Sequence, residues 1–291
     1  MIVILTCLVI SSPSWGPGTH VYLGTLLLKR MRRRLKKDQQ RLLTEHRDAF
    51  LYGGIAADII NFKKYGGIKN HCHNWNMKER FEALIAEEHE HAFLYGYLCH
   101  LAADVVAHNH FVPFQVLHGL PPVMLGHVYW EARADGRVDE EYWHVIDGLR
   151  NRVELHQNDL IINRAVRKKA LSLSSNKWIF NNVLLARSKK SWRDIMDQMR
   201  RRNPRGELHD RFLKDCQRRC LDNMWKVFDD LEFERLRCWD PNGLAALREA
   251  RQVRRSLIQR FGSRSAGAEQ SQVVARELYR LTDEPRLAAP R

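Results

Sequence analysis

The apolar positions of the chain recur mostly with helical spacing. Leu23, Leu26, Leu27, Met31 and Leu35 fall on one side of a helix, and few segments alternate with a period of two. The same spacing predicts further helices over residues 78–108, 123–134, 206–230 and 242–261. An all-α, bundle-like fold is therefore expected.

Glycine and proline divide this helical pattern. Gly53-Gly54 and Gly66-Gly67 predict turns, and Pro113 with Pro121-Pro122 and Gly119 predicts a break before the helix at 123–134. Further loops are expected at 203–206 and 241–243. The last 25 or so residues hold few large apolar side chains, which is typical of a frayed tail.

Charge and histidine are unevenly distributed. The formal net charge is +14, of which residues 146–291 carry +13, while 12 of the 14 histidines lie before residue 146. The pattern indicates a front half that carries chemistry and a basic rear half. A basic surface attracts anionic lipid, nucleic acid or acidic substrates, but a solvated surface without any partner explains it equally well.

The N-terminus and the cysteines bear on cellular location. Residues 2–10 form an apolar run too short to span a bilayer as a helix, and small residues at 12 and 14 follow it. This predicts an export signal over residues 1–14, cleaved before Trp15, and a periplasmic or secreted protein that can associate with membranes. A free α-amino group on Trp15 could bind a metal once deprotonated. The six cysteines form no CxxC pair, so no disulfide framework or thiolate zinc site is expected.

Two histidine–carboxylate pairs have the spacing of one helix face. His100 precedes Asp104 by four residues, and His127 precedes Glu131 by four, so both members of a pair can point at one metal ion. Two such pairs are about what chance supplies in a chain of this composition. Each pair alone is better explained as a hydrogen bond on a helix surface.

The apolar surroundings favour a metal site. Asp104 and Asp58 both lie in stretches of small and apolar residues, and a buried carboxylate is costly unless it is paired or bound to metal. His71 and His73 follow Asp58, and His20 lies near the start. Imidazole and carboxylate together suit zinc.

The order of these residues resembles the bacterial zinc-dependent phospholipase C family over residues 15–135. The series is Trp15-(x4)-His20, Asp58, His71 or His73, His100-(x3)-Asp104-(x5)-His110 and His127-(x3)-Glu131. His73, which precedes Asn-Trp, is preferred over His71, and the interval from His110 to His127 is longer than the family pattern.

The resemblance implies an all-helical fold with up to three zinc ions. One zinc would be held by the Trp15 amino group and carbonyl, His20 and Asp104. A second would be held by Asp58, His73, His100 and the bridging Asp104, with Asp58 also a candidate general base. The third would be held by His110, His127 and Glu131.

The expected organisation is a signal at 1–14, a zinc-binding catalytic core at 15–135, a basic helical extension at 136–262 and a flexible tail at 263–291. The leading functional hypothesis is a zinc-dependent hydrolase of phospholipid phosphodiesters, with an anionic membrane surface as a further partner. A zinc nuclease or nucleotidase of the same fold is the alternative, because those enzymes also begin Trp-Gly with a histidine five positions after the tryptophan. They use aspartate where Glu131 stands, which favours the phospholipase. A non-catalytic zinc-binding protein is the third hypothesis.

Overall fold

The computed structural model describes residues 15–59, 72–118, 126–150, 152, 155–166, 172–179, 208–261 and 266–279. Every regular element within these ranges is helical, which confirms the all-α prediction. The elements, in chain order, are α2 (Pro17–Arg30), η1 (Met31–Arg33), α3 (Lys37–Glu45), α4 (Arg47–Ala56), α5 (Met77–Glu82), α6 (Glu88–Val106), the π-helix η4 (Ala107–Phe111), α7 (Val112–His118), α8 (Gly126–Asp135), α9 (Glu140–Arg150), α10 (His156–Ala165), α11 (Leu173–Ile179), α13 (Asp210–Lys226), α14 (Asp230–Leu236), α15 (Leu244–Phe261) and α16 (Ala266–Leu278).

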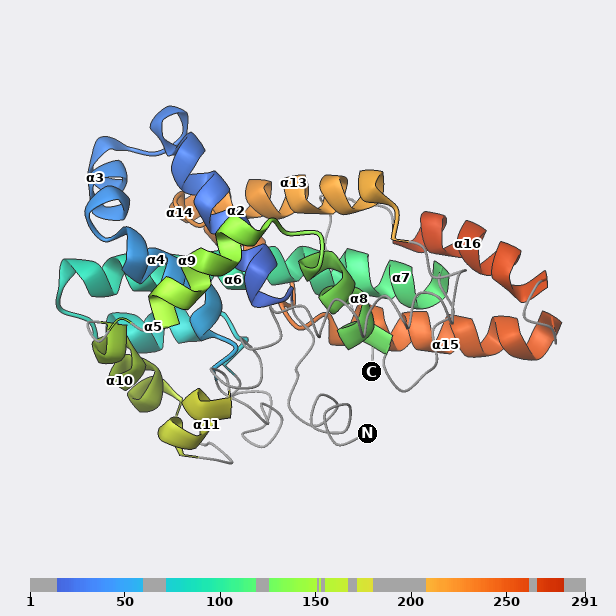
Figure 1. Cartoon of the computed structure of the whole chain (residues 1–291). Helices are drawn as coiled ribbons and strands as arrows, with labels where there is room; N and C mark the ends of the chain where they lie inside the picture. Colours follow the sequence, from blue (N-terminus) through green and yellow to red (C-terminus); the bar gives the residue numbers. More distant parts are fainter. Residues whose placement is uncertain are drawn as a thin grey trace.

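Helix α6 runs through the middle of the molecule, and α2, α4 and α13 pack against it (Figure 1). Its residues from Ala92 to Val106 are almost all buried, as expected for a helix that is apolar on every side. At one end of the molecule α7 packs against α15 and α16. Helices from the rear half of the chain thus complete the core that surrounds α6.

Glycines allow α4 and α6 to approach unusually closely. A Cβ atom on Gly53 would lie 2.1 Å from the carbonyl oxygen of Phe93, and a Cβ on Gly96 would lie 1.9 Å from that of Phe50. The prediction of a turn at Gly53-Gly54 is therefore wrong, because α4 continues through both residues and uses them for packing. The turn predicted at Gly66-Gly67 lies outside the described residues.

The single helix predicted over residues 78–108 is two helices. The chain leaves α5 after Glu82 and enters α6 at Glu88, where the side chain of Glu90 accepts hydrogen bonds from the backbone of Ala86 and Glu87. That arrangement caps the start of α6 and uses donors that would otherwise lack partners. The break predicted at Pro113 is also wrong, since proline is tolerated in the first turn of α7.

The described residues near the C-terminal end are more regular in structure than their composition suggests. The prediction of a flexible tail from residue 263 is wrong for residues 266–279, because α16 packs on α7 and the buried Tyr279 donates a hydrogen bond to the carbonyl of Ala246. Among the described helices, none combines the length and apolar character needed to cross a bilayer. Residues 1–14, the predicted signal, lie outside the described ranges.

Candidate metal centre

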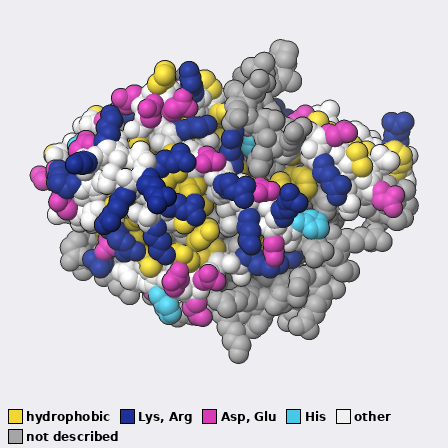
Figure 2. Space-filling model, turned by 90° about the horizontal axis from the view of Figure 1, so that it is seen from above, with side chains coloured by type: hydrophobic (Ala, Val, Ile, Leu, Met, Phe, Trp, Pro, Cys, Tyr) yellow, Lys and Arg dark blue, Asp and Glu magenta, His cyan; other side chains and the backbone are white. Residues whose placement is uncertain are grey.

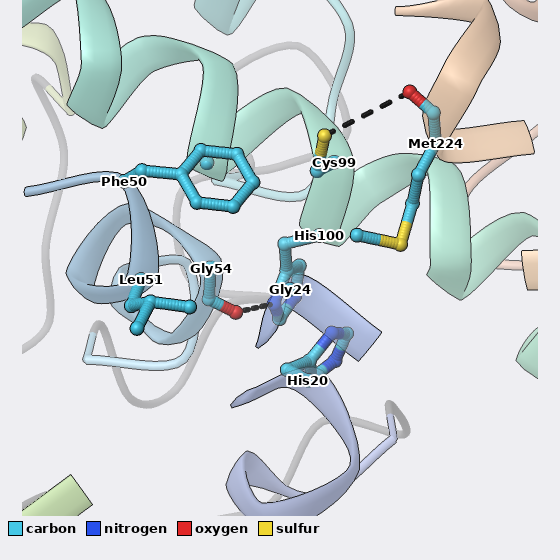
Figure 3. A pocket seen from close by; sticks show the side chains of 9 residues that line it. His20, Gly24, Phe50, Leu51, Gly54, Cys99, His100 and Met224 are labelled. Carbon is cyan, nitrogen blue, oxygen red and sulfur yellow. Dashed lines mark hydrogen bonds between the residues drawn. The ribbon is translucent and has the colours of Figure 1, made fainter. Parts of the chain in front are cut away.

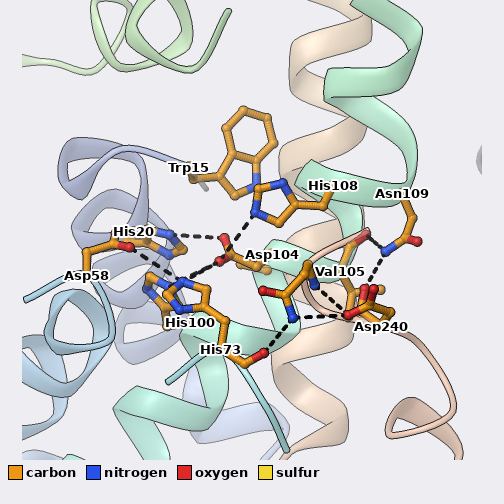
Figure 4. Close-up of polar contacts among 12 residues, drawn as sticks. Trp15, His20, Asp58, His73, His100, Asp104, Val105, His108, Asn109 and Asp240 are labelled. Carbon is orange, nitrogen blue, oxygen red and sulfur yellow. Dashed lines mark hydrogen bonds and ion pairs between the residues drawn. The ribbon is translucent and has the colours of Figure 1, made fainter. Parts of the chain in front are cut away.

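The carboxylate of Asp104 is the meeting point of four histidine side chains (Figure 4). It projects from α6 and is fully buried. The Nε2 atoms approach it at 3.3 Å (His20 to Oδ1), 3.1 Å (His100 to Oδ2), 3.2 Å (His73 to Oδ2) and 3.7 Å (His108 to Oδ2). A second carboxylate joins the group, because Oδ1 of Asp58 lies 3.4 Å from Nε2 of His73.

These side chains come from four separate parts of the chain. His20 is on the first turns of α2, Asp58 follows α4, and His73 lies in the segment before α5. His100 and Asp104 share one face of α6, as their spacing predicts. Folding therefore gathers ligand-type groups that are up to 88 positions apart in the sequence, from His20 to His108.

The spacing of the donor atoms suits zinc. Tetrahedral bonds of about 2.0–2.1 Å place ligand atoms about 3.4 Å apart. The Nε2 atoms of His73 and His100 lie 3.0 Å apart, and each is within 3.2 Å of the same oxygen of Asp104. His20, Asp58 and His100 form a second group whose ligand atoms lie within 4.8 Å of one another.

The hydrogen bonds around the centre leave the right atoms for a metal. Nδ1 of His100 lies 2.9 Å from the carbonyl oxygen of Gly54, which can only accept, so Nδ1 carries a proton and Nε2 is the ring nitrogen that faces the centre. Both oxygens of Asp104 and the Nε2 atoms of His20 and His108 are buried without a hydrogen bond. Buried polar atoms are normally hydrogen-bonded, so this set fits a site for a cation.

The electrostatics agree with this interpretation. Burial alone would raise the pKa of Asp104, but the imidazoles of His100, His108 and His20 outweigh it and hold the pKa well below its usual value. Burial and the neighbouring His100 lower the pKa of His20 to about 4. At neutral pH the centre thus offers an ionised carboxylate and a neutral imidazole, which are the forms that bind zinc.

Asp58 is the group of the centre that is nearest to solvent. Its side chain is 13% exposed, whereas those of His20, His73, His100, Asp104 and His108 are at most 2% exposed. On the other side of His20 and His100 the described residues enclose a cavity of about 10 Å³, lined by Gly24, Gly54 and other residues (Figure 3). Such a cavity holds one water molecule at most, so a substrate does not enter the centre through it.

The sequence interpretation missed His108. It stands four residues after Asp104 and eight after His100, so the helical spacing that selected the first two residues could also have selected the third. The structure directs His108 towards Asp104, while the ring of His110 lies 5.5 Å from that of Trp239. Both histidines lie in the π-helix η4, and such segments occur frequently at functional sites.

The remaining predicted ligands are not among the groups of metal-type ligands found in the described residues. His110 and Glu131 are buried but belong to none of the three groups of metal-type ligands found among the described residues. The side chain of His127 and the whole of His71 lie outside the described residues. The indole of Trp15 is buried, with its ring 4.5 Å from Phe111, and its Nε1 donates to the sulfur of Cys220 at 3.2 Å.

A carboxylate from α8 fixes the beginning of α2. The oxygens of Asp135 accept hydrogen bonds from the backbone of Gly18 at 3.1 Å and from the backbone and hydroxyl of Thr19 at 2.9 and 2.6 Å. Gly16, the residue at the start of the helix, has no side chain to supply this cap. Burial raises the pKa of Asp135 to about 6, although these hydrogen bonds lower it. Asp135 therefore orients the turn that carries His20.

The metal-free protein should lose stability in mild acid. The pKa of His20 is 6.5 unfolded and about 4 folded, so the unfolded chain binds more protons between these values and gains stability relative to the fold as the pH falls. The difference amounts to about 3 kcal/mol. Urea unfolding at pH 7 and pH 4 would measure it, and a His20→Gln variant with the same pH dependence as the wild type would contradict the assignment.

Comparison with known proteins agrees with the geometry. A family model described as zinc dependent phospholipase C matches residues 19–189, more than half of the chain, and includes the segments that carry Asp58, His73 and Asp104. No match was found among curated proteins or among solved structures. The family match extends beyond residue 135, where the resemblance in the ligand series ends. The family implies zinc as the metal of the protein, and the chain belongs to the zinc-dependent phospholipase C family of hydrolases.

Proposed function

We propose that the protein hydrolyses the phosphodiester of a phospholipid on the glycerol side, and that the groups around Asp104 hold the zinc for this reaction. The observation that carries the proposal is the convergence of four imidazole nitrogens and two carboxylates on one buried point, with several of these atoms lacking hydrogen bonds. The family membership supports phospholipid as the substrate class.

The catalytic role that we assign to each residue follows from how deeply its side chain is buried. Zinc supplies Lewis acidity, which lowers the pKa of water towards about 7 and neutralises charge on phosphoryl oxygens. His73, His100 and Asp104 would hold the zinc, and the other oxygen of Asp104 faces His20. Asp58, next to solvent, accepts the proton of the attacking water as that water bonds to phosphorus and the bond to the glycerol oxygen breaks. The proton then passes to the leaving oxygen.

The test compares two substrate classes on one preparation. Protein loaded with zinc is assayed with phosphatidylcholine vesicles and with single-stranded DNA, before and after removal of the metal by a chelator and readdition of zinc. Phosphocholine release that depends on zinc is the expected result. Cleavage of DNA alone would establish the nuclease alternative, and tight zinc binding without either activity would establish a non-catalytic zinc protein.

The predicted export signal has a test of its own. N-terminal sequencing of exported protein tests cleavage before Trp15.

The proposal includes binding of the protein to membranes that contain anionic lipid. Residues 29–37 hold seven Lys and Arg side chains, all exposed, and within the described part of the chain none of them pairs with a carboxylate. Figure 2 shows basic side chains gathered on the face that carries α2 and α13. Each basic group near an anionic bilayer contributes about 1 kcal/mol, so vesicles with phosphatidylserine should bind the protein more tightly than neutral vesicles, and high salt should remove the difference.

His108 and His110 should differ in their effect on the centre. Because His108 lies 3.7 Å from Asp104 and His110 packs near Trp239, His108→Gln should weaken zinc binding about 10- to 100-fold, and His110→Gln should weaken the Asp104 centre less. Titration with a competing chelator measures both affinities. The opposite order would favour the ligand series taken from the sequence over the geometry of the structure.

A further inference from the structure

A short loop from the rear half of the chain contacts the segments that carry the metal ligands. Residues 239–243, here the clamp loop, join α14 to α15 and lie outside the 19–189 region that the family model matches. Figure 4 shows Asp240 beside Asn109, close to the group around Asp104. The loop makes separate contacts with the His73 segment and with the π-helix.

The first contact holds the backbone at His73. Nδ2 of Asn242 donates to the carbonyl oxygen of His73 at 2.7 Å. The amide of Asn242 is itself oriented, because Oδ1 of Asp240 accepts from its Nδ2 at 3.1 Å and from its backbone nitrogen at 2.9 Å. Two residues further along the same segment, Nε1 of Trp75 donates to the carbonyl of Trp239 at 2.8 Å.

The second contact holds the π-helix that presents His108. Nδ2 of Asn109 donates to the carbonyl oxygens of Asp240 at 2.8 Å and of Val105 at 2.9 Å, so one side chain ties the loop to the end of α6. Gly243 has a φ of 54°, and a Cβ on it would lie 2.2 Å from the carbonyl oxygen of His108 and 2.5 Å from its Cβ. Only glycine fits this backbone conformation and this close approach.

We propose that the clamp loop is a positioning element of the metal centre, in which Asn242 and Gly243 fix His73 and His108 relative to Asp104. His73 and His108 lie on the two sides of the Asp104 carboxylate in Figure 4, so a single loop that holds both sets the width of the space between them. On this proposal, residues 19–189 supply the metal ligands, and the clamp loop outside that region orients His73 and His108. This inference rests on the zinc site of the proposed function.

Asn242→Ala and Asn242→Asp test the proposal in the full-length protein. Alanine removes the donor, and aspartate keeps the shape but places an acceptor against the carbonyl of His73. Loss of an outer hydrogen bond of this kind typically weakens metal binding 10- to 100-fold, so both variants should show that loss in zinc affinity by chelator competition. The visible absorption spectrum of the cobalt-substituted protein should also change, which a merely structural role would not cause. Gly243→Ala should act in the same direction.

Leu244→Ala is the matched control, because Leu244 is the next residue after the loop and its side chain is 45% exposed. It should bind zinc and cobalt as the wild type does. Unchanged zinc affinity and an unchanged cobalt spectrum in both Asn242 variants would overturn the proposal, while a wild-type protein that binds no zinc would overturn the proposed function itself. If Asn242→Ala fails to fold, Asn242→Asp alone decides.

Discussion

Asp104→Asn should abolish zinc binding at the centre and lower phosphodiesterase activity by about 1,000-fold or more. All four imidazoles approach this carboxylate, and both of its oxygens are buried without hydrogen bonds. Charge stabilisation by bound metal contributes several kcal/mol to such reactions, and each 1.36 kcal/mol is a factor of ten in rate. Elemental analysis and phosphocholine release measure the two effects.

A surface aspartate provides the comparison. Asp48 pairs with Arg47 and Arg152 on the outside of the molecule, so Asp48→Asn should retain zinc and activity. Circular dichroism establishes that both variants keep their helices. Full activity of Asp104→Asn without bound zinc would refute the centre, and full zinc content without activity would confine Asp104 to a catalytic role.

Gly96→Ala should destabilise the fold by about 3 kcal/mol. The new Cβ would lie 1.9 Å from the carbonyl oxygen of Phe50 and 3.0 Å from the backbone nitrogen of Gly54, so α4 and α6 would have to separate. Both neighbours are backbone atoms that cannot rotate away, and overpacking of a tight interface costs about 1–3 kcal/mol or more. Urea unfolding of the metal-free protein gives the free-energy difference.

Gly148→Ala is the control for this prediction, because a glycine in the same molecule is replaced where the structure has room for a Cβ atom. Gly148 lies in α9, is exposed, and has no atom within 4 Å of a Cβ built on it. Alanine there should stabilise the helix by about 0.5–1 kcal/mol. If Gly96→Ala were as stable as the wild type, the close approach of α4 and α6 would be wrong.

The same substitution should also affect the metal centre. Because the carbonyl of Gly54 orients His100, Gly96→Ala should also lower zinc affinity.

Helical spacing was sufficient to predict the class of the fold and the position of the central helix. It failed at Gly53-Gly54, because a glycine pair has the same local meaning in a turn and in a close helix crossing. It also failed before α6, where the cap formed by Glu90 divides a continuous apolar pattern into two helices. Both errors concern interactions that a local pattern does not contain.

The candidate centre, like the fold, could be predicted from the sequence only in part. His100 and Asp104 could be paired from their spacing. The apolar surroundings and then the family order added His20, Asp58 and His73, which the structure brings into the same cluster. The family order supplied His110, although the spacing of four residues from Asp104 could have selected His108, which the structure directs to that carboxylate. The clamp loop could not be predicted because it contacts the centre across more than 130 residues of sequence.

The clamp loop places a condition on when the protein can acquire its metal. The groups involved extend from His20 to Gly243, so a chain still emerging from the ribosome lacks part of the centre until most of its length has been made. Metal sites of this kind rarely exist before folding. A chain truncated after the family-matched region should accordingly capture zinc poorly, and insertion of the metal becomes a late event in the maturation of the protein.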